Sequence, residues 1–431
     1  MSCGNTYNVR SFGATGDGST PDQTAIQDAI DAAAAAGGGV VCFPAGTYRI
    51  TATLVPKPHV SIHGEARANS IVKVDGPIWG FRSSEAAHVD YECEFADLTV
   101  RGNGDPTGSN GSGNNLGGIN LERCDYVTFR NVRIDLFSAV NAFGLALGEC
   151  FWSVLDRCFF YFNQNVDCEL YVQTNGCNQT VIRDCKFFGR QMPSCIGLRI
   201  RGTQNVLVTG CDFEGDGNGN VGIDLQASNG ITLIGNYLEL WQGPAIRASV
   251  AGLGGCTRVI VAGNVINTSG GSVGSYAVDL NNTTPSAPNR HWILHHNRFA
   301  GLSGNAKGIG LGNAVDCITY SNDMEGVQDL LDTVPGQLDN RPFVGYTGTT
   351  SWNPNPLGAK SATSITVPVH GARMGDPAFA SHTGLPVGAL LVLGAYVEAA
   401  DTVRCVLVNN SSSSIDVGPG TLRAVVLKQL V

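Results

Sequence analysis

Apolar and polar positions alternate in short runs along most of this chain, and one short phrase returns at nearly regular intervals. The phrase is an apolar pair, then Asn, Cys or Asp, then an aromatic or aliphatic residue two places on. Successive copies are 25 to 34 residues apart. A repeat of this length predicts a solenoid, in which each turn buries its apolar side only against its neighbours. The polar members of the phrase are Asp97, Asn131, Cys158, Cys185, Cys211, Asn236, Asn264, Asn297 and Asn322.

The segments between these positions are short, rich in strand-forming residues and bounded by Gly or Asn, as in "VLVTGCDFEG" and "ITLIGNYLEL". Turns of this length with such corners predict an all-β fold, a parallel β-helix. The polar member would then stack on itself at a bend from one turn to the next. Its side chain would bond backbone groups that the bend leaves free.

A second column of strands runs beside the first, in phrases such as "GLRI" and "GIDL". Because side chains alternate along a strand, the residue between two apolar ones faces outward. The predicted outward column is Asn120, Ala146, Glu169, Arg199, Asp224, Arg247 and Asp279.

Residues 1–50 differ from the repeats and predict a cap over the open end of the solenoid. A strand is followed by a helix with Thr20 as N-cap, Pro21 at the first helical position and Gln23 completing a capping box. Gly37 to Gly39 end this helix. The cap would shield the unpaired edges of the first turn.

The remaining chain divides by composition into three parts. The repeats predict a β-helix over residues 51–340, and the Gly, Pro, Ser and Thr of 341–355 predict a linker. Short alternating runs such as "TSITVPVH" and "TVRCVLVNN" then predict a small antiparallel β-sandwich over 356–431.

The segment from Tyr7 to Ile50, with "FGATGDGSTPDQTAIQDAI" and "FPAGTYRI", resembles the entry segment of the pectin-lyase-like superfamily. Phage tailspike depolymerases, pectin- and fructan-processing enzymes and mannuronan epimerases belong to that superfamily. The resemblance implies a right-handed β-helix, often a homotrimer, that acts on polysaccharide. The C-terminal region is similar to small domains of phage tail proteins, which implies trimerisation or capping. The local catalytic signatures of the superfamily are mostly missing here, since the sequence has neither a "DPHE" stretch like that of the epimerases nor a paired-Asp arrangement like that of the polygalacturonases.

Composition narrows the range of partners. The net charge of -9 leaves no basic face for a nucleic-acid partner. No apolar run has the length of a membrane span, and "MSCGNTYNV" lacks the features of a signal peptide, so we expect a virion or extracellular protein without membrane insertion. Of the 14 Cys, those in the repeated phrase are expected as buried thiols, whereas Cys3, Cys93 and Cys405 are candidates for pairing between chains.

Glu169 and Asp224 form the first candidate catalytic pair. They are two rungs apart, about 10 Å between backbones, near the upper separation of inverting glycosidases. Arg199 lies between them and would orient a hydroxyl or an acidic sugar, and Tyr171 and Arg201 lie two residues further along. One carboxylate would act as acid and the other as base.

The same column has a plain structural interpretation. Glu169, Arg199, Asp224, Arg247 and Asp279 alternate in charge, as a sheet surface prefers. On that interpretation they stabilise stacked strands or a subunit contact. Otherwise Arg247 extends the binding surface as a further substrate contact.

A second candidate site lies on the first column. Counting outward past the repeated polar residue brings Tyr161, Glu214 and Glu239 onto one face, with Asp212 one outward place earlier. Carboxylates on adjacent rungs would be about 5 Å apart, the separation of a retaining pair, and would raise one pKa. Trp241 would stack on a sugar ring. Acidic residues also keep a solenoid soluble, so this set too has a structural alternative.

Two classes of function follow from these features. The first is a tailspike-like trimeric enzyme that binds and cleaves a cell-surface or extracellular polysaccharide, as a hydrolase through the carboxylates or as a lyase with Arg199 and Arg201 as the cations. The second is a non-catalytic virion protein that uses the β-helix for rigidity and receptor contact. Virion or tail proteins are further expected partners, and neither reading requires a cofactor or a metal.

Overall fold

In the computed structural model, the residues described are 5–427 apart from 105–113, 138, 173–175, 190–194, 216–219, 250–253, 268–275, 283–287, 301–306, 313, 325–330, 334–344 and 386–390. The chain divides into two compact units. One is Met1–Ala314 with Asp323–Leu330, and the other is Val315–Asn322 with Leu331–Val431.

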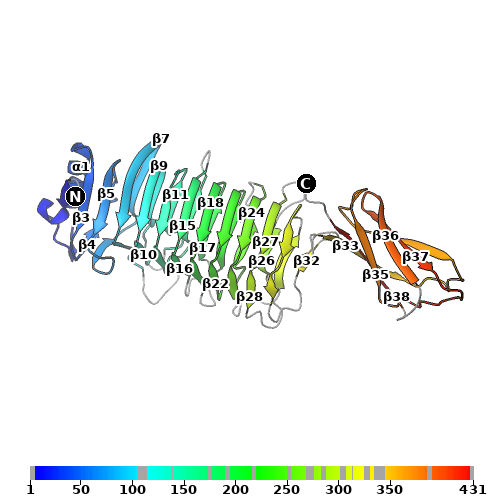
Figure 1. Cartoon of the computed structure of the whole chain (residues 1–431). Helices are drawn as coiled ribbons and strands as arrows, with labels where there is room; N and C mark the ends of the chain where they lie inside the picture. The colour runs from blue at the N-terminus through cyan, green and yellow to red at the C-terminus, as the bar shows by residue number, and fades with distance from the viewer. Residues whose placement is uncertain are drawn as a thin grey trace. The chain divides into compact units, whose positions relative to one another are not determined.

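The first unit is a parallel β-helix, as its sequence predicts (Figure 1). Among the described residues, the parallel β-helix has a larger sheet of 20 strands and a smaller sheet of 12. Over the middle of the chain each turn adds two strands to the larger sheet and one to the smaller.

The strands of the larger sheet are β1 Thr6–Asn8, β3 Gly39–Phe43, β5 Val60–Gly64, β7 Trp79–Ala96, β9 Gly117–Arg130, β11 Phe143–Gly148, β12 Val154–Asp156, β14 Val166–Tyr171, β15 Asn178–Arg183, β17 Ile196–Arg201, β18 Gln204–Thr209, β20 Val221–Gln226, β21 Asn229–Ile234, β23 Ile246–Ser249, β24 Thr257–Ala262, β26 Tyr276–Asn282, β27 Arg290–His295, β29 Lys307–Gly312, β30 Ile318–Tyr320 and β32 Leu331–Thr333. Those of the smaller sheet are β2 Asp17–Pro21, β4 Gly46–Ile50, β6 Ser70–Val74, β8 Thr99–Arg101, β10 Arg133–Asp135, β13 Phe159–Tyr161, β16 Lys186–Phe188, β19 Asp212–Glu214, β22 Tyr237–Glu239, β25 Val265–Asn267, β28 Arg298–Ala300 and β31 Asp323–Met324.

Apolar side chains of successive turns stack inside the β-helix. Phe160, Phe187 and Phe213 form one such stack, with ring centroids 4.8 and 4.4 Å apart and rings nearly parallel. All three rings are fully buried. Parallel strands bring equivalent residues of each turn into register, so one apolar position in the repeat becomes a continuous core column.

The predicted ladder of buried asparagines is confirmed at Asn236, Asn264 and Asn297. The amide group of Asn264 donates to the carbonyl of Leu233 at 2.9 Å and to Oδ1 of Asn297 at 2.9 Å. Its own Oδ1 accepts the backbone N–H of Asn236 at 2.9 Å. Each side chain therefore satisfies backbone groups at the bend, where the sheet ladder is interrupted.

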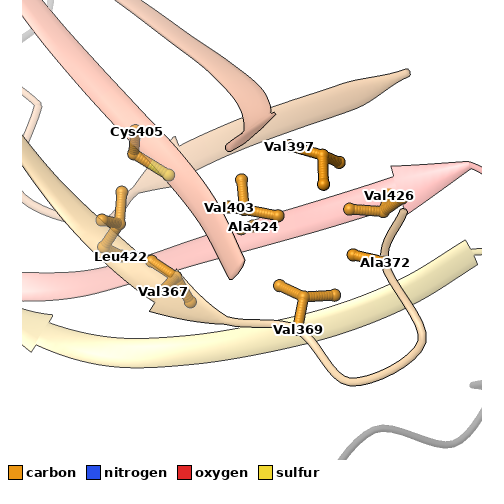
Figure 2. Close-up of a cluster of buried hydrophobic side chains, with 9 residues drawn as sticks. All are labelled: Val367, Val369, Ala372, Val397, Val403, Cys405, Leu422, Ala424 and Val426. Atoms are coloured by element: carbon orange, nitrogen blue, oxygen red, sulfur yellow. The ribbon is translucent and has the colours of Figure 1, made fainter. Parts of the chain in front are cut away.

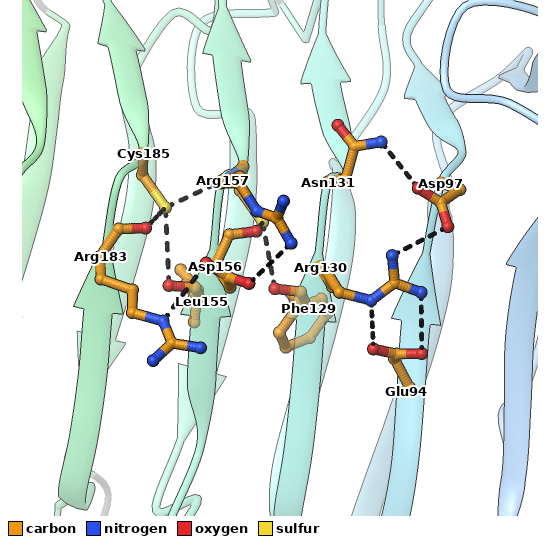
Figure 3. A network of polar contacts seen from close by, with 11 residues as sticks. Glu94, Asp97, Phe129, Arg130, Asn131, Leu155, Asp156, Arg157, Arg183 and Cys185 are labelled. Atoms are coloured by element: carbon orange, nitrogen blue, oxygen red, sulfur yellow. Dashed lines mark hydrogen bonds and ion pairs between the residues drawn. The ribbon is translucent and has the colours of Figure 1, made fainter.

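At Asp97 and Asn131, the first two members of the repeated phrase, the observed strand register differs by one residue from the predicted one. The register Arg133↔Phe159 aligns Val132, rather than Asn131, with Cys158. Asp97 and Asn131 occupy the preceding position, with φ of 56° and 53°. This position is left-handed in successive turns, and Asn and Asp tolerate that conformation better than most residues. In Figure 3, Asn131 donates to Asp97 at 2.7 Å, beside the ion pairs of Arg130.

The cysteines of the ladder are buried free thiols, as predicted. The backbone N–H of Cys158 donates to Sγ of Cys185 at 3.3 Å, so the sulfur replaces the amide oxygen found elsewhere in the column. Cys93 and Cys405 are also buried free thiols, which contradicts their expected pairing between chains. Cys405 lies in the apolar core of the C-terminal unit. Cys3 lies outside the described residues.

The N-terminal cap is present, but its helix begins later than the sequence suggests. Helix α1 spans Gln23–Ala35 after the short 3-10 helix η1, Val9–Phe12, and its N-cap is Asp22 rather than Thr20. Thr20 and Pro21 belong to strand β2. The buried Asp22 carboxylate accepts the N–H groups of Thr15 and Gly16 at 2.7 and 3.1 Å instead of capping the helix.

The C-terminal unit contains two three-stranded antiparallel sheets, in the orders β33-β38-β35 and β34-β37-β36. Valines from both sheets meet in one core, drawn in Figure 2. Strand β33 pairs with β38 along its full length, so the linker expected over 341–355 is wrong for this stretch. Its Gly- and Thr-rich composition conceals alternation, because Tyr346 and Trp352 pack against the core. The strands are β33 Gly345–Trp352, β34 Ala362–Pro368, β35 Ala378–His382, β36 Leu391–Ala399, β37 Thr402–Asn409 and β38 Gly420–Leu427.

Candidate functional site

Polar side chains cover the outer face of the first strand of successive turns. The residues between them, such as Leu145 and Leu170, are fully buried in the core, so alternation directs the polar ones outward. We call this surface the polar strip. Its first column is Arg82, Asn120, Ala146, Glu169, Arg199, Asp224 and Arg247, and its second is Ser84, Glu122, Gly148, Tyr171, Arg201, Gln226 and Ser249. The register of the predicted outward column is confirmed.

Tyr171 bends along the polar strip over two rungs. Gly148 permits this, because a Cβ at this position would lie 2.4 Å from Cζ of Tyr171. The Tyr171 hydroxyl donates to Oε1 of Glu122 at 2.5 Å and lies 3.2 Å from Oδ1 of Asn120. Burial and the neighbouring carboxylate raise the pKa of Tyr171, so the phenol stays protonated and can serve as a donor.

Asp224 is enclosed, contrary to the expectation that it faces a ligand. Its side chain has no exposed surface, and its oxygens accept hydrogen bonds from Arg247 at 3.0 Å, Ser249 at 3.0 Å and Gln226 at 2.7 Å. Arg199 lies 3.6 Å away. These bonds use three of the four lone-pair sites of the carboxylate, and its complete burial keeps a water molecule or a sugar hydroxyl from the fourth. The structure therefore places Asp224 as an anchor for the arginines.

Glu169 has a different environment on the same column. Its side chain is 5% exposed, and Arg199 and Arg201 lie 3.7 and 3.4 Å from Oε1. That oxygen is fully enclosed, and it meets both arginines at ion-pair distance rather than through short hydrogen bonds like those of Asp224. Burial raises the pKa of Glu169, although the two arginines oppose the shift. A buried carboxyl with a raised pKa is a candidate proton donor.

The second predicted set lies on the smaller sheet. Tyr161, Phe188, Glu214 and Glu239 follow one another in register, as predicted. Lys186 lies 2.9 Å from Glu214, and the Tyr237 hydroxyl donates to Glu239 at 2.7 Å. The two carboxylates are thus each held by a surface partner.

Trp241 does not face this set. Its side chain is fully buried, and its indole N–H donates to the carbonyl of Phe213 at 3.1 Å. The expected stacking of Trp241 on a sugar ring is therefore wrong. Glycine at positions 189, 215 and 222 leaves room for the indole inside the turn, so the side chain folds inward. Sequence alternation near a corner does not reveal this change of direction.

Two residues of the polar strip, Ser84 and Glu122, were not predicted as site residues from the sequence. Glu122 is nearly buried and accepts hydrogen bonds from Ser84 and Tyr171. Both Ser84 and Glu122 lie two residues beyond members of the first column, so the same alternation that identified Asn120 points to them. Their link to Tyr171 depends on its rotamer, which sequence does not specify.

Known proteins resemble this chain in two respects, the sequence of its N-terminal segment and its fold. A family model described as rhamnogalacturonase A/epimerase, pectate lyase-like, matches residues 6–92, which supports the resemblance found in the sequence. The chain is 41% identical over 112 residues to alginate lyase 7 of Azotobacter vinelandii, and 42% identical over 112 residues to mannuronan C5-epimerase AlgE2 of the same organism. These matches cover 23% of this chain but only 13% and 11% of the two relatives.

Solved structures share the fold over most of the chain. The Dettilon tailspike protein aligns with a TM-score of 0.59 at 13% identity, covering 98% of this chain and 94% of the tailspike. The ORF18 protein of Geobacillus virus E2 aligns with a TM-score of 0.58 at 16% identity, covering 99% and 79%. At these identities the likeness establishes the fold. Among the described residues, the chain contains no helix with the length and apolar content needed to span a bilayer.

Proposed function

We propose that this chain binds a polysaccharide along the polar strip and cleaves it by acid–base chemistry, with Glu169 as the proton donor. The proposal draws on the pectate lyase-like N-terminal segment and on the relatives named for alginate lysis and epimerisation, although these matches cover a minority of the chain. The polar strip supplies the surface, since it extends over consecutive rungs and suits an extended polymer.

The observation that carries the proposal is the contrast between the two buried acids of the polar strip. Asp224 forms three close hydrogen bonds, as a structural ion pair requires. Glu169 is 5% exposed, and its Oε1 meets Arg199 and Arg201 at 3.7 and 3.4 Å, farther than the partners of Asp224. A purely structural charge ladder would place its arginines within hydrogen-bonding distance of both acids. The longer contacts of Glu169 suit a carboxyl that exchanges an arginine for a substrate group.

The neighbouring groups then take distinct roles. Protonated Glu169 donates to the glycosidic oxygen, while Arg199 and Arg201 bind a sugar hydroxyl or carboxylate. Tyr171 and Glu122 form the opposite side of the site, where the Glu122 carboxylate accepts a proton from water in hydrolysis or from a sugar carbon in elimination. Asp224 positions Arg199 and Arg247. The set on the smaller sheet, with Tyr161, Glu214 and Glu239, is the alternative site.

We further propose a homotrimer borne on a virion, in line with the tailspike likeness over nearly the whole chain. The C-terminal sandwich would hold the three chains together. Light scattering of the intact protein should give three times the mass of one 45.2 kDa chain. A monomer would exclude this assembly without affecting the polar strip.

The test incubates the protein with neutral and acidic bacterial polysaccharides, and measures reducing ends and unsaturated products in parallel. Glu169→Gln should abolish product formation, whereas the matched change Glu239→Gln on the smaller sheet should not. The reverse pattern would move the site to the smaller sheet. Binding without any product, from the native chain and all variants, would favour the non-catalytic virion protein that uses its β-helix for receptor contact.

A further inference from the structure

A column of left-handed residues recurs near the start of the second strand of successive turns and, in the first of these turns, inside the long strand β9. Its members have φ between 52° and 69°. Each stands two residues before one of the register-paired residues Thr128, Val154, Val181, Leu207, Thr232, Ile260 and Ile293. The members of this corner column are Tyr126, Trp152, Gln179, Asn205, Gly230, Arg258 and His291.

Two neighbouring members of the corner column are exposed aromatic residues. The rings of Tyr126 and Trp152 stack with centroids 4.8 Å apart and planes only 5° from parallel. Tyr126 remains 40% exposed and Trp152 42%. Phe151 contacts the Trp152 ring edge-on, with centroids 5.8 Å apart. The pair is therefore held in one orientation while much of its surface stays open to solvent.

Beyond Trp152 the column steps down in size, from Trp to Gln, Asn and Gly. A groove of about 540 Å³ opens at this step. Gln179 and Asn205 are exposed on it, and Asn205 is oriented by a 3.0 Å hydrogen bond to Asn178. Nothing that lines the groove carries a charge at neutral pH. The lining residues are Tyr126, Trp152, Val154, Gln179, Thr180, Val181, Asn205 and Leu207.

The fold itself does not require aromatic residues here. Glycine and asparagine adopt the left-handed conformation most readily, and the corner column uses both at Asn205 and Gly230. A bulky residue in this conformation is an outlier. Trp152 and Tyr126 both have a strained backbone conformation and substantially exposed side chains. Their packing therefore contributes little to the stability of the fold.

We propose that this groove is a second glycan-binding site, which takes a neutral sugar ring with its apolar face against the Tyr126–Trp152 pair. An aromatic face suits the C–H groups of a sugar ring, and the amides of Gln179 and Asn205 offer both donors and acceptors to its hydroxyls. The absence of charge in the lining selects against uronic acids and phosphates. The choice of ligand rests on the proposed polysaccharide function, but the site is separate from the polar strip.

Trp152→Asn is the informative variant, since asparagine suits this corner and the fold should survive. Dextran and inulin serve as neutral probes and alginate as the acidic one, with binding measured by retardation in affinity gels and by quenching of tryptophan fluorescence. We expect retardation by at least one neutral probe, weakened about tenfold or more in Trp152→Asn. The melting temperature should stay within about 2 °C of that of the native chain.

Tyr396→Asn is the matched control, because Tyr396 is a 51% exposed aromatic residue of the C-terminal unit. It should leave neutral-glycan binding unchanged. Glu169→Gln should also leave this binding intact while it removes product formation, which separates the corner site from the proposed catalytic site. The inference is overturned if neither neutral probe binds, or if Trp152→Asn binds as well as the native chain. A change of oligomeric state in Trp152→Asn would also overturn it, by showing that a second copy of the chain covers the pair.

Discussion

Asp167 tests whether a carboxyl buried in this β-helix stays protonated at neutral pH. The side chain lies on β14 with no exposed surface. Its Oδ1 accepts one hydrogen bond, from Asn163 at 2.8 Å, and Oδ2 has no partner. Burial raises the pKa of this carboxyl from 3.8 to about 8. At neutral pH the folded chain therefore holds a proton on Asp167 that the unfolded chain releases.

This difference makes stability depend on pH. Between the unfolded pKa of 3.8 and the folded pKa of about 8, the folded state binds more protons, so the free energy of unfolding falls as pH rises. Each pH unit inside this window costs about 1.4 kcal/mol. From pH 5 to pH 7 the contribution of Asp167 is a loss of about 3 kcal/mol. Asp167→Asn keeps the shape of the neutral acid and removes the titration.

The assay is guanidinium unfolding followed by circular dichroism at pH 5, 6 and 7, under conditions where unfolding and refolding curves coincide. Relative to the native chain, Asp167→Asn should gain about 3 kcal/mol between pH 5 and pH 7. Asp75→Asn is the control, because Arg49 lowers the pKa of Asp75 below its ordinary value and both states are ionised in this range. Equal pH slopes for Asp167→Asn and the native chain would refute the reasoning, since Asp167 would then be ionised in the fold.

Three further changes test the asparagine ladder, the stacked core and the polar strip. Asn264→Ala removes the side-chain hydrogen bonds to Leu233, Asn297 and the N–H of Asn236, and should lower the free energy of unfolding by about 3 kcal/mol. A loss below about 1 kcal/mol would mean that water replaces the side chain. Phe187→Ala should cost about 3 to 5 kcal/mol, whereas the same change at the half-buried Phe188 should cost clearly less, and equal costs would contradict the stacked core. Gly148→Ala places a Cβ where Tyr171 lies, so glycan cleavage should fall as far as in Tyr171→Phe; unchanged cleavage would remove Tyr171 from the site.

The sequence predicted much of the fold because the repeat is local. A period close to 27 residues and alternation within each strand were enough to place Glu169, Arg199 and Asp224 on one column. The register failed by one residue at Asp97 and Asn131, where Asn and Asp suit both the ladder and the left-handed position before it. Local preference cannot distinguish two adjacent positions that favour the same residue types.

The sequence by itself determined which residues share a column, since strand alternation and a regular repeat need no knowledge of distant contacts. Only the tertiary structure decided what those residues do there. It enclosed Asp224 with three hydrogen bonds, gave Glu169 longer ion pairs, folded Trp241 into the core and stacked Tyr126 on Trp152. Burial and hydrogen bonding depend on side-chain rotamers and on neighbours from other turns. Those neighbours meet only once the chain has wound into its helix.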